Sequence, residues 1–260
     1  MKHTKAASGA ISEESRGNEM KLLIIRHADP DYAVDSLTPA GWREAALLAD
    51  RLENTAITKI YCSPLGRAKD TASLTLQRKG MEATELDWLR EFSPRMTDPD
   101  TGLERVCWDW LPQRWMQEPA YYDRNLWCHT PAMEAIGVPE EYAWVCRGLD
   151  ELLARHGYLR EGELYRAVRP NRDTVALFCH LGVECVLLAH LIGASPMVLW
   201  HGLCPRTSSV TTVITEERRA GVASFRISAM GDTAHLSAVG VEPSFAARFC
   251  ETYDSEERHD

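Results

Sequence analysis

Several features that would assign this 260-residue chain to a function class are missing from it. No apolar run reaches the roughly 18 residues of a membrane span, and residues 1–19 hold no apolar core like that of a signal peptide. The net charge of -9 argues against binding to nucleic acid or anionic membrane. We therefore expect a cytoplasmic protein with a disordered extension over residues 1–19 and a folded part over residues 20–260. Met20 is an alternative first residue.

The cysteines form no metal-binding or disulfide pattern. The eight are scattered, with no Cys-x-x-Cys pair and no Cys/His pair at the spacing of zinc ligands. Cys62 and Cys179 fall inside apolar runs, where cysteine packs as a small hydrophobe. This pattern predicts reduced thiols and no bound metal or other cofactor. There is also no Gly-x-Ser-x-Gly elbow around Ser63, which argues against a serine nucleophile there.

Apolar runs alternate with helical patterns at both ends of the chain. Strands are predicted over residues 21–25, 59–62, 82–86, 174–179, 209–215 and 224–230, the last two joined by a turn at 216–221. Helices are predicted from Thr38, which can cap one, from Ser63 to about Leu76, and over 181–192. This alternation favours an α/β fold, a three-layer αβα sandwich with a mostly parallel sheet.

The middle of the chain has a different character. Residues 93–146 contain six of the prolines and five of the eight tryptophans. We interpret them as a helical, Trp-rich insertion, or cap, over the carboxyl ends of the strands. Two interpretations stay open: the tryptophans only fill the core of the insertion, or they shape a pocket for an apolar or aromatic group.

An Arg-His pair follows the first predicted strand. Arg26 and His27 stand where the ligands of open α/β sheets bind. Alone the pair is weak evidence, because a histidine after a strand is usually an ordinary loop residue. However, His180 follows the strand at 174–179 in the same way, and Arg67 lies in the first turn of a predicted helix, whose free N–H groups also attract anions. Glu91 adds a carboxyl group beyond the strand at 82–86.

These five residues suit phosphoryl transfer through a phosphohistidine. A neutral imidazole attacks phosphorus, while arginines and the second histidine hold the phosphoryl oxygens. A carboxylic acid protonates the leaving oxygen and then activates water. No metal is required, since the arginines supply the positive charge.

Four segments resemble the motifs of the histidine phosphatase superfamily, also called phosphoglycerate-mutase-like. They are residues 22–28 (LLIIRHA), 37–45 (LTPAGWREA), 63–72 (SPLGRAKDTA) and 179–183 (CHLGV). The resemblance implies that His27 is the nucleophile, that Arg26, Arg67 and His180 bind phosphate, and that Glu91 is the acid.

The chain departs from the family pattern at three places. Ala28 and Leu181 replace common glycines, and neither change removes a reactive group. The loop after His27 lacks an asparagine that many members have and carries Asp29 and Asp31 instead. The missing asparagine argues mildly against a mutase.

We expect hydrolysis of a small-molecule phosphomonoester. A phosphoglycerate-type mutase and a non-catalytic binder of phospho-ligands are the alternatives.

Overall fold

The computed structural model describes residues 19–98, 101–245 and 251–254. The disorder predicted for residues 1–19 lies outside these ranges except at Glu19. Within them, no helix is long and apolar enough to cross a membrane. The seven cysteines that they contain are free thiols, as the scattered pattern predicts.

One eight-stranded sheet organises the described residues, in the order β5-β4-β10-β1-β11-β12-β9-β8. Its parallel half comprises β5 (Ala83–Glu85), β4 (Lys59–Cys62), β10 (Thr174–Cys179) and β1 (Lys21–Arg26). Its antiparallel half comprises β11 (Val210–Arg219), β12 (Val222–Asp232), β9 (Leu164–Ala167) and β8 (Tyr158–Glu161). The predicted α/β fold with a parallel central sheet is confirmed, and the sheet continues beyond β1 in antiparallel strands.

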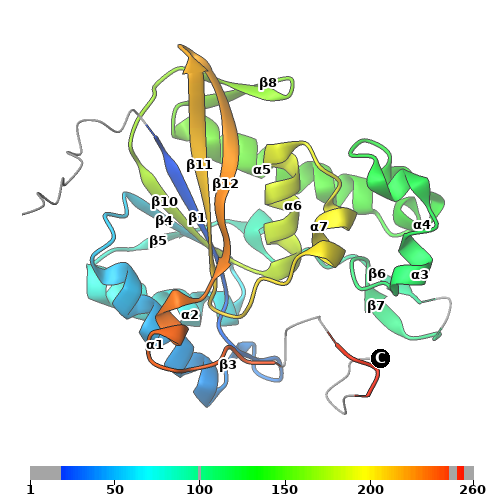
Figure 1. Ribbon diagram of the computed structural model, residues 1–260, viewed down its shortest axis with the longest axis horizontal. Helices are drawn as coiled ribbons and strands as arrows, with labels where there is room; N and C mark the ends of the chain where they lie inside the picture. Colours follow the sequence, from blue (N-terminus) through cyan, green and yellow to red (C-terminus); the bar gives the residue numbers. More distant parts are fainter. Residues whose placement is uncertain (1–18, 99–100, 246–250, 255–260) are drawn as a thin grey trace, which may run out of the picture.

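Helices cover both faces of the sheet (Figure 1). On one face, Leu23 and Ile25 of β1 pack in a cluster with residues of α1 (Pro39–Glu53) and α2 (Gly66–Lys79). On the other, Leu22 and Ile24 pack with α5 (Val138–Arg155) and α6 (Leu181–Ile192). Alternate residues of a strand point to opposite faces, so the apolar run of β1 is buried on both sides.

Of the two residues predicted to cap helices, Thr38 does so and Ser63 does not. The Thr38 side chain accepts a hydrogen bond from the Gly41 N–H at 3.0 Å, as a cap should. The prediction that Ser63 caps the next helix is wrong, because α2 begins only at Gly66. There the Asp35 carboxylate, from a distant loop, accepts the Gly66 N–H at 2.7 Å.

The β11–β12 hairpin is longer than predicted. Its strands run through most of the charged stretch at 216–221, and the turn shrinks to Ala220 and Gly221. Gly221 has a φ of 81°, which favours glycine. Charged residues extend the strands because their side chains pair across the solvent-facing surface, as Glu216 does with Arg226.

Residues 93–146 form one hairpin followed by short helices. The described elements are β6 (Arg95–Thr97), β7 (Glu104–Val106), α3 (Pro112–Trp115), η3 (Pro119–Tyr122), η4 (Trp127–His129), α4 (Pro131–Glu134) and the start of α5. Trp127 is fully buried against Trp200, with ring centroids 5.3 Å apart. This tryptophan fills core, as the first interpretation expects. The small remaining elements are β2 (Pro30–Asp31), β3 (Ser36–Leu37), η2 (Asp87–Leu89), α7 (Pro196–Gly202) and α8 (Ala234–Ser237).

Candidate active site

The carboxyl ends of three neighbouring parallel strands bring polar side chains together. His27 follows β1, His180 follows β10 and Ser63 follows β4. The rings of His27 and His180 lie with their centroids 5.1 Å apart. The convergence expected at this edge of the sheet is therefore present.

The environment of His27 fixes its tautomer. Its Nδ1 lies 2.8 Å from the Ala28 carbonyl oxygen, which only accepts hydrogen bonds, so Nδ1 carries the proton. No hydrogen bond reaches Nε2 from the described residues, which leaves its lone pair available. Burial lowers the pKa of His27 well below its ordinary value, and the charges of Arg26 and Arg67 lower it further. His27 is thus a neutral imidazole with an unprotonated Nε2 at neutral pH.

His180 is held through Ser63. The Ser63 Oγ lies 2.7 Å from His180 Nε2 and accepts the Leu65 N–H at 3.2 Å. The hydroxyl proton is then directed to Nε2, which places the imidazole proton on Nδ1. Nδ1 is buried and has no partner among the described residues. Burial and the neighbouring His27 lower the pKa of His180, so this residue is neutral and offers one N–H donor.

Two arginines supply the positive charge. Arg26 is almost completely buried, and its Nη1 donates to the Pro205 carbonyl oxygen at 2.6 Å. Arg67 Nη1 pairs with Asp35 at 2.6 Å, while its buried Nε has no hydrogen-bond partner in the described parts of the chain. The structure corrects one expectation here. The Gly66 N–H at the start of α2 bonds Asp35, so this group is not open to an anion.

Glu91 is placed by backbone donors. Its Oε1 accepts from the N–H groups of Phe92 at 2.9 Å and Val183 at 3.1 Å. Burial raises its pKa against the opposing effect of Arg67. A raised pKa keeps a larger fraction of this carboxyl protonated near neutral pH, as a proton donor requires.

The structure leaves no space for a side chain at Gly182, one of the glycines of the second-histidine motif. A Cβ at this position would lie 2.6 Å from Trp108 Nε1 and 2.7 Å from Glu91 Oε1. The first turn of α6 therefore needs a glycine where Trp108 and Glu91 approach it. Leu181, which replaces the other common glycine, is buried.

A cavity of about 580 Å³ opens above the arginines. Its volume suits a whole small molecule. Its lining includes Arg26, Arg67 and Glu91 from the predicted site, and Tyr32, Arg95, Leu103, Val106 and Trp108 from elsewhere. The β6–β7 hairpin thus forms one wall, as expected if residues 93–146 shape a pocket.

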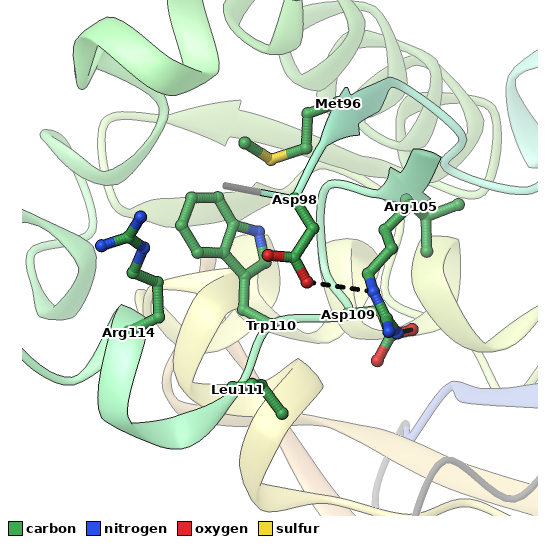
Figure 2. Close-up of a pocket in the computed structure, with 8 residues that line it drawn as sticks. Met96, Asp98, Arg105, Asp109, Trp110, Leu111 and Arg114 are labelled. Carbon is green, nitrogen blue, oxygen red and sulfur yellow. Dashed lines mark hydrogen bonds and ion pairs between the residues drawn. The ribbon is translucent and has the colours of Figure 1, made fainter. Parts of the chain in front are cut away.

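Ion pairs fix the β6–β7 hairpin to the segment that follows it. Arg105 Nε lies 3.1 Å from Asp98, and Arg105 Nη1 lies 3.3 Å from Asp109. Figure 2 shows this pairing beside Trp110, around a hollow of about 10 Å³ that is too small for a ligand.

His201 and His235, like His27 and His180, are not among the residues that line this cavity. His201 stacks on Trp115, and its Nδ1 donates to the Met197 carbonyl oxygen. His235 lies 3.1 Å from the Ser208 hydroxyl. No group of three or more His, Cys, Asp or Glu side chains within the described residues is arranged to hold a metal ion.

Comparison with known families agrees with the motifs. The profile of the histidine phosphatase superfamily (branch 1) matches residues 18–125, which contain His27, both arginines and Glu91. Over these residues the chain is similar to members of the histidine phosphatase superfamily. Adenosylcobalamin/alpha-ribazole phosphatase of Escherichia coli (strain K12) is 22% identical over 191 residues, covering 70% of this chain and 84% of that protein.

Solved structures share the fold. The mycobacterial glucosyl-3-phosphoglycerate phosphatase has a TM-score of 0.54 at 21% identity and covers 82% of this chain and 99% of its own. A phosphoserine phosphatase variant of Entamoeba histolytica, in complex with phosphoserine, has a TM-score of 0.54 at 18% identity, with coverage of 84% and 99%. Both of these solved structures are of proteins named as phosphatases.

Proposed function

We propose that this histidine phosphatase hydrolyses a small phosphorylated metabolite through a covalent phosphohistidine at His27, without a metal ion. The observation that carries the proposal is the state of His27: its Nδ1 proton is committed to the Ala28 carbonyl oxygen and its Nε2 lone pair is available. A neutral imidazole beside two arginines is a nucleophile next to a phosphate-binding site.

In the first step, His27 Nε2 forms a bond to phosphorus as the ester P–O bond breaks. The proton of the Glu91 carboxyl passes to the leaving oxygen, which departs as an alcohol. Arg26, Arg67 and the Nδ1–H of His180 hold the phosphoryl oxygens and balance the charge that they carry.

In the second step, the Glu91 carboxylate takes a proton from water. The water oxygen attacks phosphorus and the N–P bond breaks. Inorganic phosphate leaves, His27 returns to its neutral form, and Glu91 is again protonated. The arginines balance the charge of the phosphoryl oxygens in both steps, and this supports a reaction without a metal ion.

The cavity supports a small-molecule substrate. Its volume of about 580 Å³ is that of a ligand pocket. The names of the relatives point the same way, since phosphoserine and glucosyl-3-phosphoglycerate are small phosphate esters. The first test is a panel of such esters.

The test compares wild type with His27→Ala, and uses His129→Ala as the control because His129 is exposed and lies outside this cavity. Wild type and the control should hydrolyse the same esters, while His27→Ala should lose at least about a hundredfold in kcat, as removal of a catalytic group does. Acid-quenched wild type incubated with ³²P-labelled ester should retain acid-labile, base-stable label. Wild-type turnover by His27→Ala contradicts the proposal. Turnover that requires a bisphosphate primer and an acceptor indicates a mutase instead.

A further inference from the structure

The loop that follows His27 contributes an aromatic side chain to the catalytic cavity. This loop carries Asp29 and Asp31. Neither acid serves a phosphate, because carboxylates accept hydrogen bonds and repel an anion. Both also support the loop itself: Asp29 accepts from the Thr38 hydroxyl at 2.5 Å, and Asp31 accepts from the Ala33 N–H at 3.0 Å. The loop residue that lines the cavity is Tyr32.

Tyr32 stands over the phosphate-binding arginines. Its ring lies 5.5 Å from the Arg67 guanidinium, a cation–π contact. It lines the same cavity as Arg26, Arg67 and Glu91. The side chain is 61% exposed, a large value for a tyrosine, and no hydrogen bond to its hydroxyl occurs within the described residues.

We propose that the Tyr32 hydroxyl donates a hydrogen bond to a phosphoryl oxygen of the substrate, as a fourth donor beside Arg26, Arg67 and His180. This inference rests on the proposed function and adds a substrate contact to it. A phosphate monoester dianion offers only acceptor oxygens, and Tyr32 brings a hydroxyl donor to the cavity that the arginines line.

Electrostatics agree with this placement. Burial lowers the pKa of Arg26, and Tyr32 is the first of the neighbouring groups that oppose this change, which places the Tyr32 hydroxyl near the guanidinium. Although Tyr32 is 61% exposed, the surrounding protein removes part of the hydration of its hydroxyl and raises its pKa, and Arg26 and Arg67 oppose the change. Its hydroxyl therefore keeps its proton at neutral pH and acts as a donor.

The ring has a second effect, on Arg67. Asp35 holds one Nη of this arginine, and the Tyr32 ring lies over the guanidinium. The two contacts limit the rotation of the guanidinium fork. Ring and hydroxyl can be separated by substitution, because phenylalanine keeps the first and removes the second.

The experiment compares Tyr32→Phe, Tyr32→Leu and the control Tyr122→Phe, since Tyr122 is an exposed tyrosine that stacks on Trp115 away from this cavity. Tyr32→Phe should lose about 10- to 100-fold in kcat/KM, the range expected for a hydrogen bond to a charged group. Orthophosphate should inhibit it more weakly by a similar factor. Tyr32→Leu should lose more, and Tyr122→Phe should match wild type.

Three outcomes overturn the inference. They are a Tyr32→Phe enzyme within twofold of wild type, an equal loss in Tyr32→Phe and Tyr122→Phe, and a loss of kcat/KM without weaker inhibition by orthophosphate. Melting temperatures of all variants show whether any loss comes from unfolding. The parallel His27→Ala assay separates the two proposals. If His27→Ala is inactive while Tyr32→Phe is unchanged, only the role of Tyr32 fails.

Discussion

The hydroxyl of Ser63 determines which nitrogen of His180 carries a proton. It lies 2.7 Å from Nε2 and receives the Leu65 N–H on its other side. A histidine that binds phosphate through Nδ1–H needs this tautomer, because the other one would present a lone pair to an anion. Ser63 is therefore a positioning residue that acts through His180.

Ser63→Ala should reduce kcat/KM about tenfold, because His180 Nε2 loses its hydrogen-bond donor and the Nδ1–H tautomer is no longer favoured. Nitrogen-15 NMR of the labelled histidine reports the tautomer directly. Ser63→Thr keeps the hydroxyl and should restore most of the rate. Ser73→Ala, on α2, is the control, because the Ser73 hydroxyl donates to the Asp70 carbonyl oxygen of its own helix. An unchanged tautomer in Ser63→Ala contradicts this role.

The sequence shows His27 and His180 at the ends of strands. A Ser-Pro pair is typical of a helix start, so Ser63 is interpreted as a helix cap and its contact with His180 is not predicted. The rule that strand ends converge applies to Ser63 as well, since it follows β4 directly. Tyr32 carries no such signal, because only the folded loop brings its ring to Arg67.

At the scale of elements, the β6–β7 hairpin is the part of the cavity wall most suited to select substrates. Arg105 is committed to Asp98 and Asp109. Arg95 also lines the cavity, and within the described parts of the chain no ion pair or hydrogen bond holds its guanidinium. A leaving group with its own negative charge would meet this cation.

Arg95→Gln should lower kcat/KM for 4-carboxyphenyl phosphate about fivefold and leave 4-carbamoylphenyl phosphate unchanged, because only the carboxylate interacts with the arginine charge. The two esters have nearly the same shape, so their rate ratio isolates charge. Arg219→Gln, an exposed arginine at the far end of β11, should leave the ratio at its wild-type value. Equal effects on both esters would show that Arg95 does not read charge.

Long apolar elements were predictable and short polar ones were not. The strands at 59–62 and 174–179 and the helix at 181–192 match the structure, because burial on both faces requires continuous apolar runs. By contrast, β6 and β7 have three residues each and no buried residue. Pairing between backbones forms them, and this leaves little trace in the sequence.

At the scale of the whole molecule, a buried acid makes the free energy of unfolding depend on pH. Glu184 lies on α6, fully buried, near Arg26. Burial raises its pKa from 4.5 to about 7, although Thr211 and Arg26 oppose the change. The folded protein therefore holds a proton that the unfolded chain releases between pH 4.5 and 7. Stability must fall as pH rises through this window, by a total of about 3 kcal/mol.

Glu184→Gln should raise the free energy of unfolding at pH 8 by about 2 to 3 kcal/mol and change it much less at pH 5, because glutamine does not ionise. Urea unfolding at both pH values measures the difference. Glu151→Gln, an exposed site on α5, should show no such pH dependence. A gain for Glu184→Gln that is equal at both pH values would contradict the raised pKa.

The overall architecture follows from the alternation of strands and helices, whereas the burial of Glu184 depends on tertiary packing. The sequence does give one hint: Glu184 and His190 are the only ionisable polar side chains in an otherwise apolar 181–192 helix. A lone acid in such a helix indicates a buried carboxyl group, which either stays protonated or needs a compensating partner.

The contact of Gly182 with both Trp108 and Glu91 has a consequence for how this enzyme can change over evolution. Trp108 and Glu91 both line the cavity, and Glu91 is the proposed proton donor. Both side chains pack against the first turn of α6 at Gly182. A mutation that changes the cavity wall by moving Trp108 should therefore also displace Glu91. New substrate preferences should therefore arise first in the β6–β7 hairpin, which is not part of that contact.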